Sequence, residues 1–286
     1  MDTVVDVAVV GTLNVDVIVR VDRLPAPGET VLGQSMSERL GGKGSNQARA
    51  AAPLATTALV GAVGDDEPGV RMRAAAHDEG VDVTHVLQAH GKRSGQAIIE
   101  VDDDGENRIV VLSGANAALT TTHVEGSLDA LDPTIVLTQL ESPMAVTEAV
   151  AAWCVRNERR LLLNPSPAAA LDDAVVRAAD PLVVNESEAA FYAGLDIDDS
   201  DAAARRLLAI ARSAVITLGA DGVVVAQGDS IERIAVDRVR AVDTTGAGDV
   251  FAGTLAAHLA DGVDLVIAAR RSAAAATALV AQPRGG

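Results

Sequence analysis

Short strand-like runs alternate with helix-like segments along most of the chain, and this alternation limits the possible folds more than any other feature. It is typical of a mostly parallel sheet with helices packed on both faces. The strand-like runs, rich in β-branched residues or leucine, are 4–11, 58–64, 134–140, 160–165, 181–185 and 213–219. The helix-like segments are 45–55, 67–80, 143–160 and 200–213, followed by two helices between Ala247 and Val280 that join near 261–264. No linker-like composition or internal repeat divides residues 1–286, so the sequence predicts one main α/β domain.

Two segments depart from this alternation. Residues 13–40 and 94–112 show period-two hydrophobicity with no helix between their strands, and DDDGEN at 102–107 is a hairpin turn signal. Antiparallel strands inserted in a parallel α/β protein predict a small sheet that stands off the main body, and such attachments often act as lids. The alternative is an edge extension of the main sheet.

The composition argues against several classes of protein. Of the 286 residues, 49% are hydrophobic, which argues against disorder, and no apolar run is long enough to span a bilayer. A formal net charge of −17 argues against nucleic acid or an anionic membrane as the main partner. Cys154 is the only cysteine, which excludes an intrachain disulfide and a thiolate zinc site. The N-terminal stretch MDTVVDVAVVG has no basic segment of the kind that signals export, so we expect a cytoplasmic protein.

The two commonest phosphate-binding loops are absent from the glycine-rich stretches. A P-loop requires Gly, four residues and then Gly-Lys-Ser/Thr, but Gly42-Lys43 is followed by Gly44 and lacks the earlier glycine. A dinucleotide fingerprint requires G-x-G-x-x-G after the first strand, which here leads into GTLNVD. Both mismatches argue against a P-loop NTPase and against a Rossmann dehydrogenase.

The stretch AVDTTGAGD at 241–249 places small residues directly before a predicted helix. Backbone N–H groups at such a start are open to an anion, which the helix dipole favours. Asp249 in the first turn would then suit proton removal from a hydroxyl while the amides hold a transferring phosphoryl group. The alternative is an ordinary acid at a helix N-terminus. Oxygens of Asp243 and Thr245 are suited to a cation, or to hydrogen bonds within the loop alone.

Other polar residues lie where predicted strands end, which is the edge at which α/β proteins bind ligands. GTLNVD at 11–16 is one such exit, and LGGKGSNQA at 40–48 is a glycine-rich turn into a helix. Lys43 is one of only two lysines, which favours a binding site in this turn over a plain capping loop. The remaining candidates have structural alternatives as caps, first-turn acids or turn residues, and they are Glu141 in QLESP, Asn185 and Glu188 in NESEA, and Thr217 and Gly219 in TLGADG.

Taken in chain order, these motifs carry a resemblance that no single motif does. The chain resembles the ribokinase-like (PfkB-type) sugar kinases, and within that family the ribokinases, from about residue 5 to about residue 280. The matching stretches are GTLNVD, LPAPGET, GGKGSNQA, GAVGDD, SGANAAL, QLESP, NPSPA, NESEA, TLGADG and AVDTTGAGDVFAG. GGKGSNQA and DTTGAGD are the most specific of them in combination.

The resemblance implies a role for each matching residue. Asp249 corresponds to the general base that activates the sugar hydroxyl, and Gly246, Ala247 and Gly248 to the anion hole. The positions implied to hold the sugar are Asn14, Asp16, Gly42, Lys43, Asn46 and Glu141. Nucleotide binding is implied for Thr217, Gly219 and Gly222, with Ser272 facing the base, and for Asn185 and Glu188, which orient Mg²⁺ through water. Asp243 and Thr245 match part of a monovalent-cation site, usually potassium.

The resemblance also implies an architecture and an activity. The expected fold is a three-layer αβα sandwich with a β lid, formed by residues 13–40 and 94–112, and pairing of two lids implies a homodimer. The expected reaction is phosphorylation of D-ribose to ribose 5-phosphate by Mg-ATP, with potassium as activator. The alternatives are a kinase for another sugar or a nucleoside, and a non-catalytic sugar-binding protein. The chain departs from the family pattern in ALVAQPRGG at 278–286, where ribokinases usually carry a segment that supplies cation ligands and part of the adenine pocket.

Overall fold

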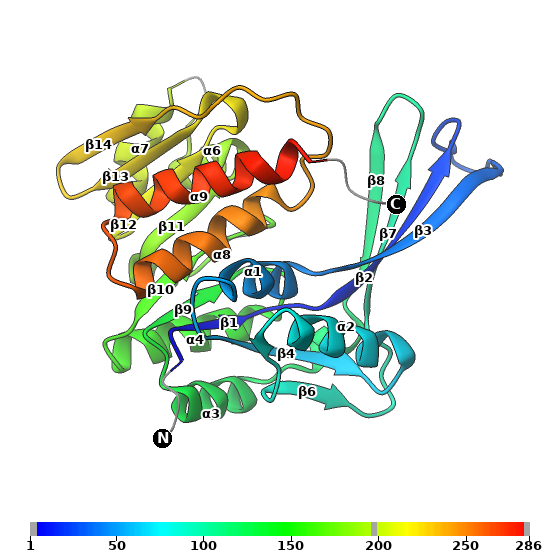
Figure 1. Ribbon diagram of the computed structural model, residues 1–286, viewed down its shortest axis with the longest axis horizontal. Helices are drawn as coiled ribbons and strands as arrows, with labels where there is room; N and C mark the ends of the chain where they lie inside the picture. Colours follow the sequence, from blue (N-terminus) through cyan, green and yellow to red (C-terminus); the bar gives the residue numbers. More distant parts are fainter. Residues whose placement is uncertain (1–4, 196–198, 283–286) are drawn as a thin grey trace.

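A ten-stranded sheet forms the body of the protein in the computed structural model, which describes residues 5–195 and 199–282. The strand order is β14-β13-β12-β11-β10-β9-β1-β4-β5, with β6 also pairing with β4 (Figure 1). The pairings from β12 to β5 are parallel, and β13 and β14 extend one edge as antiparallel strands. The strands are β1 Val7–Val10, β4 Thr57–Gly64, β5 Val81–Asp82, β6 Val86–Ala89, β9 Ile135–Thr138, β10 Arg160–Leu163, β11 Ala179–Asn185, β12 Ser213–Thr217, β13 Val223–Gln227 and β14 Ser230–Ile234.

Helices cover both faces of this sheet, so the predicted three layers are confirmed. Successive residues of a strand point to opposite faces, and in β1 Val7 and Val9 join one buried apolar cluster while Ala8 and Val10 join the other. One cluster includes α1 Lys43–Ala51, α2 Glu67–Asp78, α8 Ala247–Ala260 and α9 Leu265–Val280. The other includes α3 Thr121–Leu131, α4 Met144–Arg156, α5 Asp173–Ala178, α6 Glu186–Ala193 and α7 Ser200–Leu208.

Within the described residues, the helices that the sequence predicted are present, and two other α-helices were missed. Polar caps mark several starts: Asp66 accepts a hydrogen bond from the Gly69 N–H at 3.1 Å before α2, as Asp264 does from Val266 at 2.9 Å before α9. α3 and α5 were not predicted, because each is short or presents few buried apolar residues, whereas the start of α6 agrees with Asn185 as a cap and Glu188 as a first-turn acid. The predicted strand at 4–11 is observed from Val7, and its first residue lies outside the described ranges.

A second, four-stranded sheet stands off the body at one end, as Figure 1 shows. Its order is β3-β2-β7-β8, with β2 and β7 parallel in the centre and an antiparallel strand on each side. The strands are β2 Asn14–Val21, β3 Gly33–Gly41, β7 Gly95–Val101 and β8 Asn107–Leu112. The separate sheet and the DDDGEN hairpin turn are therefore confirmed, and the edge-extension alternative is wrong.

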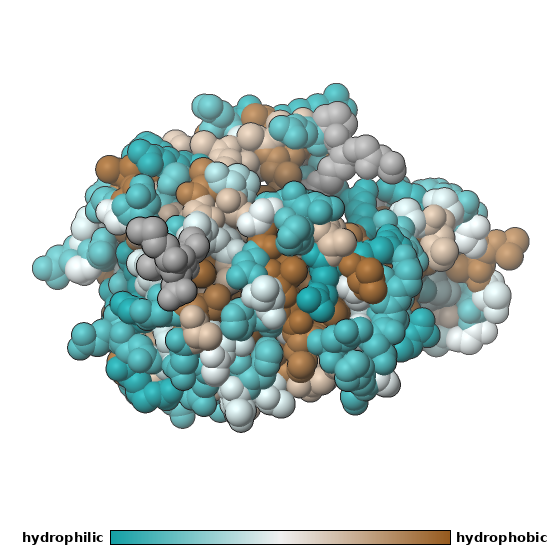
Figure 2. Space-filling model, turned by 60° about the horizontal axis from the view of Figure 1, so that its bottom comes forward, coloured by the Kyte–Doolittle hydropathy of each residue, from teal (hydrophilic) through white to brown (hydrophobic). Residues whose placement is uncertain are grey.

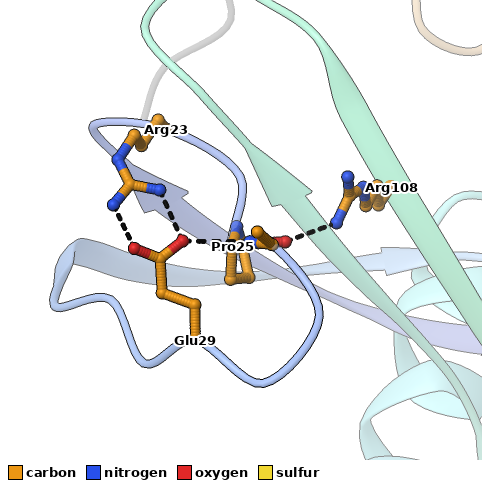
Figure 3. A network of polar contacts seen from close by, with 5 residues as sticks. Arg23, Pro25, Glu29 and Arg108 are labelled. Atoms are coloured by element: carbon orange, nitrogen blue, oxygen red, sulfur yellow. Dashed lines mark hydrogen bonds and ion pairs between the residues drawn. The ribbon is translucent and has the colours of Figure 1, made fainter.

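The loop between β2 and β3 is held in place by polar contacts (Figure 3). Arg23 pairs with the Glu29 carboxylate through both terminal guanidinium nitrogens, one of them at 2.6 Å, and the Ala26 N–H donates to the same carboxylate at 3.1 Å. Arg108 on β8 donates to the Pro25 carbonyl at 2.8 Å, which ties this loop to the opposite edge strand of the small sheet. At the outer end of the small sheet, hydrogen bonds therefore hold the β2–β3 loop against β8.

The surface is mostly polar, with apolar residues in scattered groups on the face that Figure 2 shows. The small sheet is an exception, since Ile109, Val110, Val111 and Leu112 on β8 and Met36 on β3 are exposed. Within residues 5–195 and 199–282, we found no helix whose length and apolar character would let it cross a membrane.

Candidate active site

Asp249 lies in the first turn of α8, where the side chain is only 7% exposed. Gly246 starts this helix in the left-handed region, with φ of 72°, a conformation that glycine adopts without a steric penalty. Two amides from the facing helix α1 hold the carboxylate: Asn46 Nδ2 donates to Oδ2 and Gln47 Nε2 donates to Oδ1, both at 3.0 Å. The predicted base is therefore buried and fixed at both oxygens by residues about 200 positions away in sequence.

A cavity of about 210 Å³ opens beside this carboxylate. Gly246, Gly248 and Asp249 line it from the start of α8, and a Cβ atom added at Gly248 would meet nothing within 4 Å. Small residues at a helix N-terminus leave room for an anion near backbone amides that carry the positive end of the helix dipole. Lys43 lines the same cavity and contributes a cationic side chain to it.

The turn into α1 brings several predicted sugar residues together. Gly42 has φ of 88°, and a Cβ at this position would lie 2.7 Å from the Thr12 carbonyl oxygen, so only glycine fits the turn. The turn directs the Lys43 N–H onto Glu141 Oε2 at 3.2 Å, and the Thr12 hydroxyl donates to the same oxygen. Glu141 is thus anchored beside the ends of β1 and β9.

Asp16 on β2 carries the small sheet's main contribution to this region. Burial and the nearby negative charges of Glu141 and Asp249 raise the pKa of the Asp16 carboxyl to about 6, and Arg39, its cross-strand partner on β3, partly opposes that rise. The mutual repulsion shows that three predicted carboxylates, from β2, the β9 exit and α8, face one region. Ionised carboxylates accept hydrogen bonds, and a polyol offers several hydroxyl groups that can donate to them at once. The cluster therefore suits a polyol.

Asn14, next to this cluster, has a fixed amide orientation. Its side chain is buried, and its Oδ1 accepts a hydrogen bond of 2.8 Å from Asn116 Nδ2. Asn116 is itself held by Leu13, whose N–H donates to Asn116 Oδ1 at 3.1 Å. The oxygen of Asn14 is therefore occupied, and its Nδ2 group is left to donate to a ligand.

Asn185 and Glu188 form a reciprocal capping box at the start of α6. The Glu188 N–H donates to Asn185 Oδ1 at 2.9 Å, and the Asn185 N–H donates to Glu188 Oε2 at 3.0 Å. Asn185 is therefore a helix cap and Glu188 a first-turn acid, as the structural alternative predicted. Both residues also line the 210 Å³ cavity with Asp249. Glu188 keeps its second carboxylate oxygen, Oε1, out of the capping box, and hard oxygen donors of this kind fit the water shell of Mg²⁺ near phosphates.

A larger cavity of about 490 Å³ adjoins the first one, with Thr217, Gly248 and Phe251 lining both. Thr217, Gly219 and Gly222 lie on its wall as predicted, and its other walls are largely apolar, which suits a flat heterocycle. The predicted residue Ser272 is not among the described residues that line this cavity. Ser272 is fully buried, and its hydroxyl donates to the Ala268 carbonyl at 2.8 Å, while Ala273, Ala276 and Thr277 of the same helix line the wall.

Asp243 and Thr245 lie in the loop before α8. The Thr245 N–H donates to Asp243 Oδ1 at 2.9 Å, and Arg39 on β3 forms an ion pair with Asp243 Oδ2 at 3.3 Å. This pair connects the small sheet to the loop that leads into α8. In the described ranges, no group of three or more His, Cys, Asp or Glu side chains is arranged to hold a metal ion. The end of ALVAQPRGG, 283–286, lies outside those ranges.

Several residues at the site were not singled out from the sequence. Gln47 and Asn116 lie inside the quoted motifs GGKGSNQA and SGANAAL, and Gln139 directly precedes Leu140 and Glu141 in QLESP. Asn164, which lines the 210 Å³ cavity, was missed as well. The sequence signal that could have identified Gln139 and Asn164 is a polar residue directly after a strand that is buried on both faces.

Comparisons with known proteins agree with this geometry. The family model of the pfkB family carbohydrate kinases matches residues 5–286. The chain belongs to this family. It is 36% identical to the ribokinase of Haemophilus influenzae over 251 residues, which cover 86% of this chain and 82% of the relative. It is 31% identical to the deoxyribokinase of Salmonella typhi over 274 residues, or 93% of this chain and 90% of the relative.

Solved structures support the same family. The ribokinase of Arabidopsis thaliana, solved in complex with ribose and ATP, superimposes with a TM-score of 0.88 at 28% identity, covering 99% of this chain and 95% of the other. The family's fold, a large mostly parallel sheet plus a small separate sheet, is therefore the fold of this chain, and the carbohydrate-kinase assignment from the motifs is confirmed.

Proposed function

We propose that the protein transfers the γ-phosphoryl group of ATP to O5 of D-ribose, giving ribose 5-phosphate and ADP. The observation that carries this proposal is the Asp249 carboxylate, held by two amides at the wall of a cavity that continues into a larger one. The carboxylate accepts the proton of the attacking hydroxyl, the sugar oxygen bonds to the γ-phosphorus, and the bond to the ADP oxygen breaks.

The residues around Asp249 divide the work in this proposal. The residues that bind the sugar hydroxyls are Asn14, Asp16, Gly42, Lys43, Asn46 and Glu141, while Gly246, Ala247 and Gly248 provide amides for the transferring phosphoryl charge. Aromatic residues make up 1% of the chain, so polar contacts rather than ring stacking hold the sugar. Thr217, Gly219 and Gly222 bind the nucleotide. Mg²⁺ bound with ATP would neutralise phosphate charge, and Asn185 and Glu188 would hold its waters.

Further features of the proposal extend to regulation and assembly. The small sheet, residues 13–40 and 94–112, closes over the sugar and excludes water, which prevents ATP hydrolysis. Its exposed apolar residues on β8 pair with a second copy to form a homodimer. Asp243 and Thr245 would hold a monovalent cation, potassium, whose positive charge would support the anion hole, and the reaction takes place in the cytoplasm.

Ribose-dependent release of ADP tests the proposal. We expect turnover with Mg-ATP and ribose, an increase on adding K⁺, and a loss of about 10²–10⁴-fold in kcat for Asp249→Asn with ribose affinity nearly unchanged. Asp229→Asn, an exposed acid in the β13–β14 turn, is the matched control and should keep the parent rate. A near-normal rate for Asp249→Asn would refute the assignment of the base.

A panel of substrates separates the proposal from its alternatives. Preferred turnover of 2-deoxyribose, in line with the Salmonella typhi relative, or of a nucleoside would replace ribose as the substrate while keeping the mechanism. Binding of ribose without any turnover, by every variant and the parent, would favour a sugar-binding protein.

A further inference from the structure

Behind Asp249, three amide side chains form a chain of hydrogen bonds, in which Gln47 and Gln139 are buried and Asn164 is half-buried at the wall of the 210 Å³ cavity. Gln139 Nε2 donates to Gln47 Oε1 at 2.7 Å, and Gln47 Nε2 donates both to Asp249 Oδ1 and to Asn164 Oδ1, each at 3.0 Å. Gln47 is 0% exposed and Gln139 is 1% exposed. Neither is among the described residues that line the two cavities, so these two glutamines do not face a ligand.

The direction of every hydrogen bond in this chain is determined. Asn164 Nδ2 donates to the Val183 carbonyl on β11 at 2.9 Å, so Asn164 must present its oxygen to Gln47. The Asp249 carboxylate and the Asn164 oxygen can only accept, so Gln47 presents its nitrogen to both of them and its oxygen to the Gln139 amide. Both N–H groups of Gln47 are therefore used, and a flipped amide would place two donors or two acceptors against each other.

The anchors of this chain lie on the rigid body of the fold. Gln139 follows β9, Asn164 follows β10, Val183 lies within β11, and these three strands are neighbours in the sheet. Gln47 projects from α1, which packs against α8. The chain thus connects three adjacent strands to the first turn of the helix that carries the base.

We infer that Gln47 is a positioning residue for Asp249, and that Gln139 and Asn164 act through it by fixing its amide; the inference rests on the proposed function. A carboxylate near a helix start can rotate about its terminal torsion, which is broad. The donor from Gln47 fixes the plane of the group while Asn46 holds its other oxygen, so that the carboxylate at the cavity wall meets the attacking hydroxyl in one orientation. Burying the two glutamine amides is unfavourable unless each is paired, so apolar side chains would have been simpler if packing were their only role.

Gln47→Met tests the inference, since methionine has a similar length but no donor for Asp249. We expect kcat to fall about 10- to 100-fold, the range for residues that orient a catalytic group, with KM for ribose and ATP within about twofold of the parent. Gln139→Met should lower kcat less, because it frees the Gln47 amide without removing it. Thr138→Val is the matched control: its buried hydroxyl donates to the Val10 carbonyl at 3.0 Å, next to Gln139 but outside the chain.

A second variant guards against loss of folding. Gln47→Met leaves Gln139 with an unpaired buried donor, whereas Gln47→Met combined with Gln139→Met replaces both partners by apolar groups, which is far less destabilising. The double variant should melt near the Thr138→Val control and still show the kcat of Gln47→Met. A kcat equal to that of Thr138→Val, or a loss confined to KM, would overturn the inference.

The same assay distinguishes this failure from failure of the proposed function. If Asp249→Asn loses activity and the Gln47 variants do not, the base stands and Gln47 is only a packing residue. If Asp249→Asn keeps the parent rate, the proposed base is wrong and the inference fails with it. Reduced kcat in both, with unchanged KM in the Gln47 variants, supports both assignments.

Discussion

Helices α1 and α8 approach each other closely at Gly253, one turn from Asp249, and replacing this glycine should disturb both packing and catalysis. A Cβ atom at Gly253 would lie 2.2 Å from the Gln47 carbonyl oxygen and 2.8 Å from Ala50 Cβ. Ordinary contact between such atoms requires about 1 Å more separation from the carbonyl. Gly253→Ala must therefore push α8 away from α1, and Asp249 lies one helical turn earlier on the same helix.

The size of the effect follows from two opposing contributions. Alanine favours a helix over glycine by about 1 kcal/mol, but forcing an extra methyl group into a packed interface costs about 1–3 kcal/mol. Gly126→Ala is the matched control, because Gly126 lies in the exposed interior of α3 and a Cβ there meets nothing within 4 Å. The control should gain about 0.5–1 kcal/mol, so the difference between the two variants isolates the clash.

Thermal unfolding and steady-state kinetics measure the two consequences. We expect Gly253→Ala to melt about 2–10 °C below Gly126→Ala, and its kcat to fall by up to about 10²-fold, as expected for a displacement of about 1 Å at a catalytic group. Gly126→Ala should keep the parent kcat. If Gly253→Ala is stabilised as much as Gly126→Ala and keeps full activity, the close approach of α1 and α8 does not position the base.

Two further predictions concern the sugar side of the site. The pKa of Asp16, about 6 instead of 3.8, means that the folded protein binds this proton more tightly than the unfolded chain, so the stability it contributes is fully present below about pH 4 and is lost as pH rises through about 6. Asp16→Asn should remove that loss and unfold at higher urea concentration than the parent at pH 7.5 but not at pH 4; equal pH dependence in both proteins would contradict it. Asn116→Leu leaves Asn14 Oδ1 without its donor, so ribose affinity measured by calorimetry should fall about tenfold with little change in kcat, and a lowered kcat with unchanged affinity would be the opposite result.

The sequence predicted most helices and the parallel strands at the centre of the large sheet because their signals are local, whereas β5, β6, β13 and β14 were not among the predicted strand-like runs. Runs such as IVLT on β9 and LLL on β10 are buried on both faces, and a continuous apolar run of this length is readable without knowing its neighbours. The hairpin at DDDGEN is equally local, since Asp102 Oδ1 accepts from the N–H groups of Asp104 at 3.1 Å and Glu106 at 2.9 Å. α3 was missed because only Val124, Ser127 and Leu128 of its TTHVEGSLDAL are buried, which is too few for a clear helical period.

The site was predictable where its motifs are contiguous and not where partners come from distant segments. Asp249 and the glycines before it share one short stretch, but the donors to Asp249 come from α1 and those to Asn14 from Asn116. No spacing rule connects Gln139 with Gln47, because their contact depends on how β9 and α1 pack. Ser272 was predicted to face the nucleotide base from its position in the sequence alone. Its hydroxyl donates instead to the Ala268 carbonyl within α9, and Ser272 is not among the described residues that line the cavity.

The neighbouring residues Asn46 and Gln47 show how one short segment serves two environments. Consecutive residues on a helix point about 100° apart, so Asn46 and Gln47 reach the two oxygens of one carboxylate from different sides, one half-buried and the other fully buried. This geometry requires the first turn of α1 to lie at a fixed position beside the first turn of α8. The tight turn at Gly42, which packs against Thr12, determines that position. In the proposed function GGKGSNQA therefore positions the base as well as binding the sugar, and insertion of one residue between Gly42 and Asn46 would misplace both amides together.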